Sequence, residues 1–169
     1  MAYYFTTEAI SFQPIADTST TIKHKLGTIV VAEDPVYGEG EFIYLLGVAS
    51  TVVGSWVIWG GSAAGVPAYQ TILAPNTAIL GAPLAVSMSI NVAGQYGWYQ
   101  ISGAAVGLTN GTGLTDVPVG ISSTAGATST TLQTGRQVNN ARTISAVGTP
   151  SGNLQLVSIM RPFMQGAIT

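Results

Sequence analysis

The chain has 169 residues, of which 47% are hydrophobic and only 7% are charged, and its formal net charge is −2. The hydrophobic content excludes disorder of the whole chain and is enough for one domain with a core. The small negative charge argues against binding to nucleic-acid phosphates, and the absence of cysteine excludes disulfides and thiolate metal ligands. Because soluble monomers usually carry about 25% charged residues, we expect part of this surface to be covered in an assembly.

Residues 1–25 differ in composition from the rest of the chain. Threonines and one proline surround scattered apolar side chains that follow no regular period. We therefore expect an extended N-terminal arm with local strand pairing over residues 1–25, and a single β domain over residues 26–169. The first residues lack a basic region followed by an apolar run and a cleavage site, so we expect no secretory signal.

His24 is the only histidine and lies between Lys23 and Lys25. A metal site would need further histidine or cysteine ligands, which the sequence lacks, and a serine hydrolase would have to use this sole histidine. We therefore expect His24 to lie at the surface in a basic turn. The acidic cluster of residues 33–41 does not have the ligand spacing of a known calcium loop, and we expect a solvated turn there.

From Phe42 to Thr115 the chain contains no Asp, Glu, Lys, Arg or His. The first part of this stretch, Phe42–Gly61, has about 20 residues, which is the length of a membrane-spanning helix. Valine and isoleucine in this run favour strands, glycine and serine interrupt it, and no basic cluster flanks it. We predict two buried strands joined by a bend, and no membrane association.

Short β-type segments bounded by glycine, proline, asparagine or serine recur along the chain, and no long helical period is present. This spacing predicts an all-β fold of the sandwich, jelly-roll or barrel type. The predicted strands are Ile29–Val31, Phe42–Val48, Val52–Trp59, Tyr69–Leu73, Leu84–Val92, Trp98–Ile101, Thr128–Leu132, Thr143–Val147 and Leu154–Met160. The small-residue stretch 122–134 is interpreted as a loop or as a strand lying on another subunit.

Two of these strands have informative side-chain patterns. In residues 86–92, apolar side chains alternate with serine and asparagine, which predicts a half-buried strand whose polar side chains face solvent. In residues 98–101, Trp98 and Tyr99 point to opposite faces. We expect that strand to lie between the core and a second packed surface.

A search for reactive motifs gives no catalytic residue, no cofactor and no metal. No serine lies in a Gly-x-Ser-x-Gly motif, and the glycines at 111 and 113 lack the third glycine of a dinucleotide-binding loop. Asp17-Thr18-Ser19 resembles half of an aspartic-protease signature, but a second copy is missing. We therefore do not expect an enzyme.

Three segments carry a family resemblance. The aromatic run Gly40–Val57 with its small-residue bend is followed by Pro83–Val86 and then by Gly94–Gly103, which contains Gly-Trp-Tyr-Gln and closes on glycine. This order resembles capsid decoration (cement) proteins of tailed bacteriophages. The resemblance implies a small β-rich protein that binds the outside of a completed phage head, often as a trimer or dimer, and joins neighbouring major capsid subunits.

On this basis we expect a structural protein of the virion, made in the host cytoplasm and located on the outer capsid surface. Its partners would be the phage major capsid protein and copies of itself, as a homotrimer rather than a homodimer. Candidate interface residues are Tyr3, Tyr4, Phe5, Trp56, Trp59, Arg136, Arg142, Arg161 and Phe163. For at least one of Trp56 and Trp59, core packing is the competing interpretation.

A carbohydrate-binding or adhesive β module, such as a fibre or lectin-like domain, is the alternative. In that case aromatic side chains would stack on sugar rings. The candidates for this role are Trp56, Trp59, Tyr96, Trp98 and Tyr99.

Overall fold

Twelve β-strands and no helix form the part of the chain that the computed structural model describes, which is residues 4–5, 12–47, 51–61 and 67–167. The strands are β1 (Tyr4–Phe5), β2 (Thr18–Ser19), β3 (Ile29–Asp34), β4 (Gly38–Leu46), β5 (Trp56–Ile58), β6 (Ile72–Leu73), β7 (Leu84–Ser87), β8 (Tyr96–Leu108), β9 (Pro118–Ile121), β10 (Thr128–Ser129), β11 (Gln137–Thr143) and β12 (Leu154–Met164). The predicted all-β fold is confirmed.

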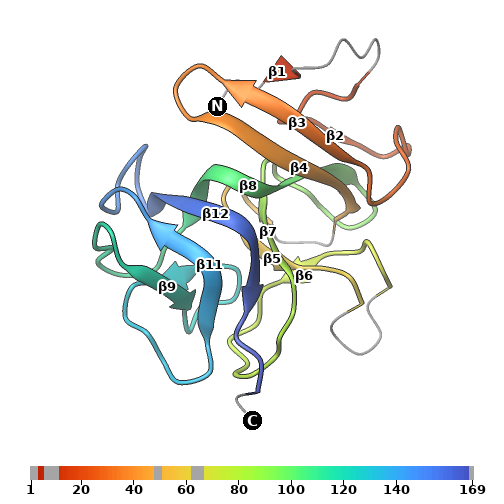
Figure 1. Ribbon diagram of the computed structural model, residues 1–169. Coiled ribbons are helices and arrows are strands. Elements are labelled where there is room, and N and C mark those ends of the chain that lie inside the picture. The colour runs from red at the N-terminus through yellow and green to blue at the C-terminus, as the bar shows by residue number, and fades with distance from the viewer. Residues whose placement is uncertain (1–3, 6–11, 48–50, 62–66, 168–169) are drawn as a thin grey trace.

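The named strands pair antiparallel in one curled sheet that forms a half-barrel (Figure 1). The main path runs β1-β3-β4-β8-β12-β11-β9-β10, and β5, β6 and β7 attach beside it. The long strand β8 joins the two halves, because its first part pairs with β4 and its second part pairs with β12. Gly103 lies at this change of partner with φ of 99°, and a Cβ atom there would lie 2.4 Å from the carbonyl oxygen of Glu39.

The strands β5 and β7 are buried on both faces. Trp56 and Val86 on one face pack into the larger core, together with side chains of β8, β9, β11 and β12. Val57 and Ala85 on the other face pack against β4 and the aromatic end of β8. Burial on both faces explains why these strands read as nearly continuous apolar runs.

The stretch Phe42–Gly61 forms β4 and β5, as two separate strands. Within the described residues, no helix is long and apolar enough to span a membrane. Trp98 and Tyr99 are both fully buried, and they pack into different hydrophobic clusters. The prediction of a strand between two packed surfaces is therefore confirmed for this part of β8.

The prediction for residues 86–92 is wrong. Regular strand structure ends at Ser87, and the polar residues Ser89 and Asn91 are buried whereas Ile90 is 64% exposed. Asn91 is held by Thr51, whose hydroxyl donates to the Asn91 carbonyl at 2.5 Å and accepts from its amide at 3.0 Å. The Asn91 side chain donates to the hydroxyl of Tyr99 at 2.8 Å. These hydrogen bonds form only in the folded chain, and they allow the polar side chains of this segment to be buried.

Two later segments differ in part from their predicted structure. Predicted strand Thr143–Val147 overlaps β11 only at Thr143, because β11 is built from the polar residues that precede it. Stretch 122–134 contains the short strand β10, which pairs with β9 of the same chain.

Residues 12–25, predicted as part of an extended arm, pack on the domain. Ile15 is 3% exposed, and β2 pairs with the start of β8. His24 is half-buried, so it lies only in part at the predicted surface, with its ring stacked on Phe12 at 4.9 Å and lying 5.3 Å from the ring of Trp98. Its Nε2 accepts a hydrogen bond from the backbone amide of Gln13 at 3.1 Å, and burial lowers the pKa of the imidazole.

The acidic cluster is a hairpin turn, as predicted. It connects β3 to β4, and one carboxylate oxygen of Asp34 accepts hydrogen bonds from the amides of Val36 and Tyr37 at 2.8 and 3.0 Å. Asp34 itself is 3% exposed, so one member of the cluster stabilises the turn rather than facing solvent.

Candidate functional site

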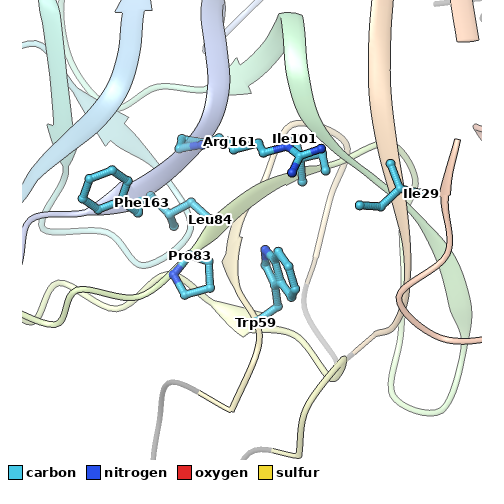
Figure 2. A pocket seen from close by; sticks show the side chains of 8 residues that line it. Ile29, Trp59, Pro83, Leu84, Ile101, Arg161 and Phe163 are labelled. Carbon is cyan, nitrogen blue, oxygen red and sulfur yellow. The ribbon is translucent and has the colours of Figure 1, made fainter. Parts of the chain in front are cut away.

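An apolar cleft of about 280 Å³ opens between β3, β7, β8 and β12, next to the residue that follows β5. Figure 2 shows Phe163 and Pro83 on one side of it, Ile29 on the other, and the indole of Trp59 between them. The cleft is lined by Ile29, Trp59, Pro83, Leu84, Ile101, Arg161, Pro162 and Phe163. Pockets for cofactors and drug-sized molecules span about 300–1,000 Å³. The cleft lies near the lower end of this range and has room for a single side chain or a small apolar group.

A bulge in β12 forms one wall of the cleft. Asn139 pairs with Phe163 and Ala141 with Ile159, so Asn140 of β11 faces residues 160–162 of β12. Asn140 and Arg161 both have left-handed backbone conformations, with φ of 58° and 46°. Such a conformation costs about 1–2 kcal/mol for a residue with a side chain.

The bulge changes which side chains of β12 face the core. Before it Val157 and Ile159 are buried, whereas after it Met164 is buried and Phe163 is 40% exposed. A regular strand would have turned Phe163 inward. Bulges of this kind often occur next to functional sites and redirect a side chain. The local backbone thus places an aromatic ring and a guanidinium at the rim of the cleft.

Trp59 and Phe163 give the cleft its aromatic character. Trp59 is half-buried, and its ring stacks on that of Tyr69 with centroids 6.4 Å apart and an interplanar angle of 19°. Tyr69 is 41% exposed and has a left-handed backbone with φ of 66°. Aromatic surface in a partly exposed cleft is typical of binding sites for side chains of other proteins.

Among the described residues that line this cleft, Arg161 is the only charged one. Its guanidinium lies 3.3 Å from the carboxylate of Glu41 on β4, and the two side chains are 65% and 33% exposed. Exposed ion pairs of this type stabilise a fold by about 0–1 kcal/mol. The pair therefore leaves both groups available for contacts at the rim.

The structure brings together three of the predicted interface residues, namely Trp59, Arg161 and Phe163. Trp56 is fully buried in the core, so the competing interpretation as core packing is the one the structure shows. Tyr3 lies outside the described residues. Tyr4 and Phe5 form β1 and pair with Glu33 and Ala32 of β3.

Arg136 and Arg142 do not line the cleft. Arg136 donates to the side chain of Gln133 at 2.5 Å. Arg142 forms an ion pair with Asp116 at 2.6 Å, and this hydrogen bond, followed by the positive charge of Arg142, lowers the pKa of Asp116. Both arginines thus have partners within the chain.

The sequence did not indicate the other lining residues, Ile29, Pro83, Leu84, Ile101 and Pro162. One signal was available, because a proline within a strand marks an edge or a bulge, and Pro162 follows Arg161 in β12. The remaining residues come from separate strands, and only the tertiary structure brings them together.

The aromatic residues proposed for sugar stacking are mostly inaccessible. Trp56, Trp98 and Tyr99 are fully buried, and the indole of Trp98 donates to the Gln13 carbonyl at 2.8 Å. Only Trp59 and Tyr96 retain partial exposure. A flat aromatic platform built from all five is therefore not present.

Comparison with known proteins gives no matching family model, no similar curated protein and no similar solved structure.

Proposed function

We propose that this protein is a structural component of a virion, a decoration (cement) protein on the outer surface of a tailed-bacteriophage head. It binds neighbouring major capsid subunits and stabilises their contacts, and it associates with itself as a homotrimer. In this role it acts by binding, without catalysis. The observation that supports this proposal most directly is the partly exposed apolar cleft with Trp59 and Phe163 at its opening.

Further exposed apolar side chains support a binding role. Exposed apolar side chains that gather in one area often mark protein–protein contact sites, whereas single ones are common on soluble proteins. The exposed large hydrophobic residues are Ile22, Ile29, Val36, Val52, Tyr69, Ile79, Ile90, Val92, Leu114, Leu132, Ile144, Met160 and Phe163. With only 7% charged residues in the chain, little charge is available to keep such a surface apart from a partner.

A cement protein needs contact surface more than it needs a reactive group. Binding free energy gained across a seam between capsid subunits stabilises the assembled shell by mass action. The resemblance of residues 40–57, 83–86 and 94–103 to decoration proteins points in the same direction. These segments contribute most of β4 and of the first half of β8, which lie in the middle of the main path of the sheet, and most of β5 and β7, which attach beside it.

The proposal is tested with purified protein and phage heads that lack it. Light scattering should give a homo-oligomer, and co-sedimentation should give a saturable, fixed ratio of this chain to the major capsid protein. Decorated heads should also withstand heating better than bare heads. A strict monomer that does not sediment with heads would overturn the proposal.

Removal of the residues before Ile10 tests the contribution of the arm separately. Residues 12–25 remain packed on the domain, so the shortened protein should fold. We expect weaker attachment to heads. Unchanged attachment would reject a role for the arm while leaving the proposed function in place.

A further inference from the structure

The apolar cleft continues into an acidic surface on the β3–β4 hairpin. Residues directly opposite in an antiparallel pair share a face, as do residues two apart in one strand. The register pairs Ile29 with Ile43, Val31 with Glu41, and Glu33 with Glu39. One face of the hairpin therefore begins with Ile29 at the cleft and ends with two glutamates at the turn.

The two glutamates at the turn form an uncompensated acidic pair. Glu33 and Glu39 are exposed and lie directly opposite each other, an arrangement that destabilises a sheet. In residues 12–47, 51–61 and 67–167 the ion pairs are Arg142–Asp116 and Arg161–Glu41, so neither member of the acidic pair has a cation partner there. A positively charged group from outside would relieve the repulsion.

The spacing between the cleft and the acidic pair restricts what can contact both. Ile29 and Glu33 are separated by four steps of strand β3, which corresponds to about 13 Å. A single side chain in the cleft cannot also reach Glu33. An extended polypeptide segment covers the same distance in four steps, and the side chains of residues i and i+4 then point to the same side. Four residues of α-helix would cover only about 6 Å.

We propose that the cleft and the acidic pair form one docking surface for an extended segment of the partner polypeptide. An apolar or aromatic side chain of that segment occupies the cleft against Trp59 and Phe163. A lysine or arginine four residues away along the segment lies between Glu33 and Glu39. This inference rests on the proposed function, since it names the chemistry by which the capsid partner is recognised.

The arrangement of charges supports this occupant over others. Arg161 at the rim is already balanced by Glu41, which leaves the acidic pair as the net charge of the surface. An anionic lipid surface or an acidic peptide would be repelled by it. The outer edge of β3 pairs with β1 at Ala32 and Glu33, so the segment docks on the face of the hairpin rather than as an added edge strand.

The probe for the test is the synthetic peptide Ser-Phe-Thr-Ser-Thr-Lys-Ser, which carries an aromatic residue and a lysine at the proposed spacing. Two control peptides replace the phenylalanine by alanine or the lysine by glutamate. Backbone amide and indole NMR signals of the full-length protein are followed during titration at low salt. We expect shifts at Ile29, Trp59 and Phe163 and also at Glu33 and Glu39, with much weaker binding of both controls.

Two variants test the two halves of the surface. Phe163→Ser, at an exposed position, should abolish binding of the phenylalanine. The double variant Glu33→Gln/Glu39→Gln should weaken binding about three- to tenfold at low salt and less at high salt. Because the double variant removes two like charges that face each other, it should not lower the stability of the fold. Weaker peptide binding by this variant would therefore not be caused by unfolding. Equal binding of the lysine and glutamate peptides, or shifts confined to other surfaces, would overturn the proposal, and so would the absence of binding.

Co-sedimentation with heads separates this inference from the proposed function. If wild-type protein and both variants attach to heads equally well, the docking surface is wrong and the cement function stands. If wild-type protein binds the peptide but not heads, the cement function is wrong and the docking surface stands.

Discussion

Replacement of Gln13 by alanine should destabilise the whole domain, although Gln13 lies in the segment predicted from sequence as an arm. Its side chain is 8% exposed. The amide oxygen accepts from the hydroxyl of Tyr44 at 3.0 Å, and the amide nitrogen donates to the carbonyls of Asp17 and Tyr96 at 2.7 and 3.2 Å. Gln13 therefore connects the N-terminal segment to both β4 and β8.

The size of the effect follows from the groups that lose a partner. Tyr44 is fully buried, and burial raises the pKa of its hydroxyl, which stays protonated and needs an acceptor. A buried polar group left without a partner costs about 1–3 kcal/mol. The Tyr96 carbonyl belongs to a half-buried residue and adds a smaller amount. We expect Gln13→Ala to lower the free energy of unfolding by about 2–4 kcal/mol, a large part of the usual 5–15 kcal/mol.

Urea unfolding followed by tryptophan fluorescence measures this change. A double-mutant cycle with Tyr44→Phe isolates the hydrogen bond between the two side chains, because that variant removes the hydroxyl and keeps the ring. We expect the double variant to cost at least about 1 kcal/mol less than the sum of the single changes. Additive effects, or a loss below about 0.5 kcal/mol for Gln13→Ala, would refute the reasoning that this segment is part of the domain.

Three further predictions concern other parts of the molecule. Burial lowers the folded-state pKa of His24 below its ordinary value of 6.5, so its contribution to stability is complete above that pH and is lost as the pH falls through the lowered pKa. Urea midpoints measured between neutral and mildly acidic pH should show this loss of stability, and the His24→Phe variant should show a smaller loss. Gly103→Ala should lower the free energy of unfolding by about 2–5 kcal/mol, because a left-handed conformation and a backbone clash add up. The control Gly94→Ala, with nothing within 4 Å of the new Cβ, should lower it by only about 1–2 kcal/mol. Equal losses of stability in thermal unfolding would argue against the clash. Arg142→Ala breaks an exposed ion pair with Asp116 and should leave the melting temperature unchanged, whereas a large drop would show that the pair stabilises the turn.

The fold class could be predicted because it depends on local signals. Short β-branched and aromatic segments between breakers gave most of the strands, and valine with interrupting glycines correctly favoured β4 and β5 over a membrane helix. The two-sided burial of Trp98 and Tyr99 followed from strand geometry alone. Each of these inferences needs only the residues within one segment.

Two of the errors have one physical cause, which is hydrogen bonding between segments that are separated in the sequence. Asn91 has a polar side chain that a local pattern assigns to solvent, but Thr51, far away in sequence, makes its burial favourable. His24 is drawn inward by Gln13 and by the ring of Trp98 in the same way. The cleft is a related case, because the left-handed backbone of Arg161 is a property of the paired strands β11 and β12.

The long uncharged stretch has two explanations, and the structure separates them. Much of Phe42–Thr115 lacks charge because it forms β4, β5, β7 and β8, whose side chains fill the interior of the single chain. That part requires no partner. The remainder includes exposed apolar residues such as Val52, Ile90 and Leu114, for which the core offers no explanation. An assembly partner is therefore indicated by the cleft, the exposed apolar side chains and the low charge of the whole chain, rather than by this uncharged stretch as such.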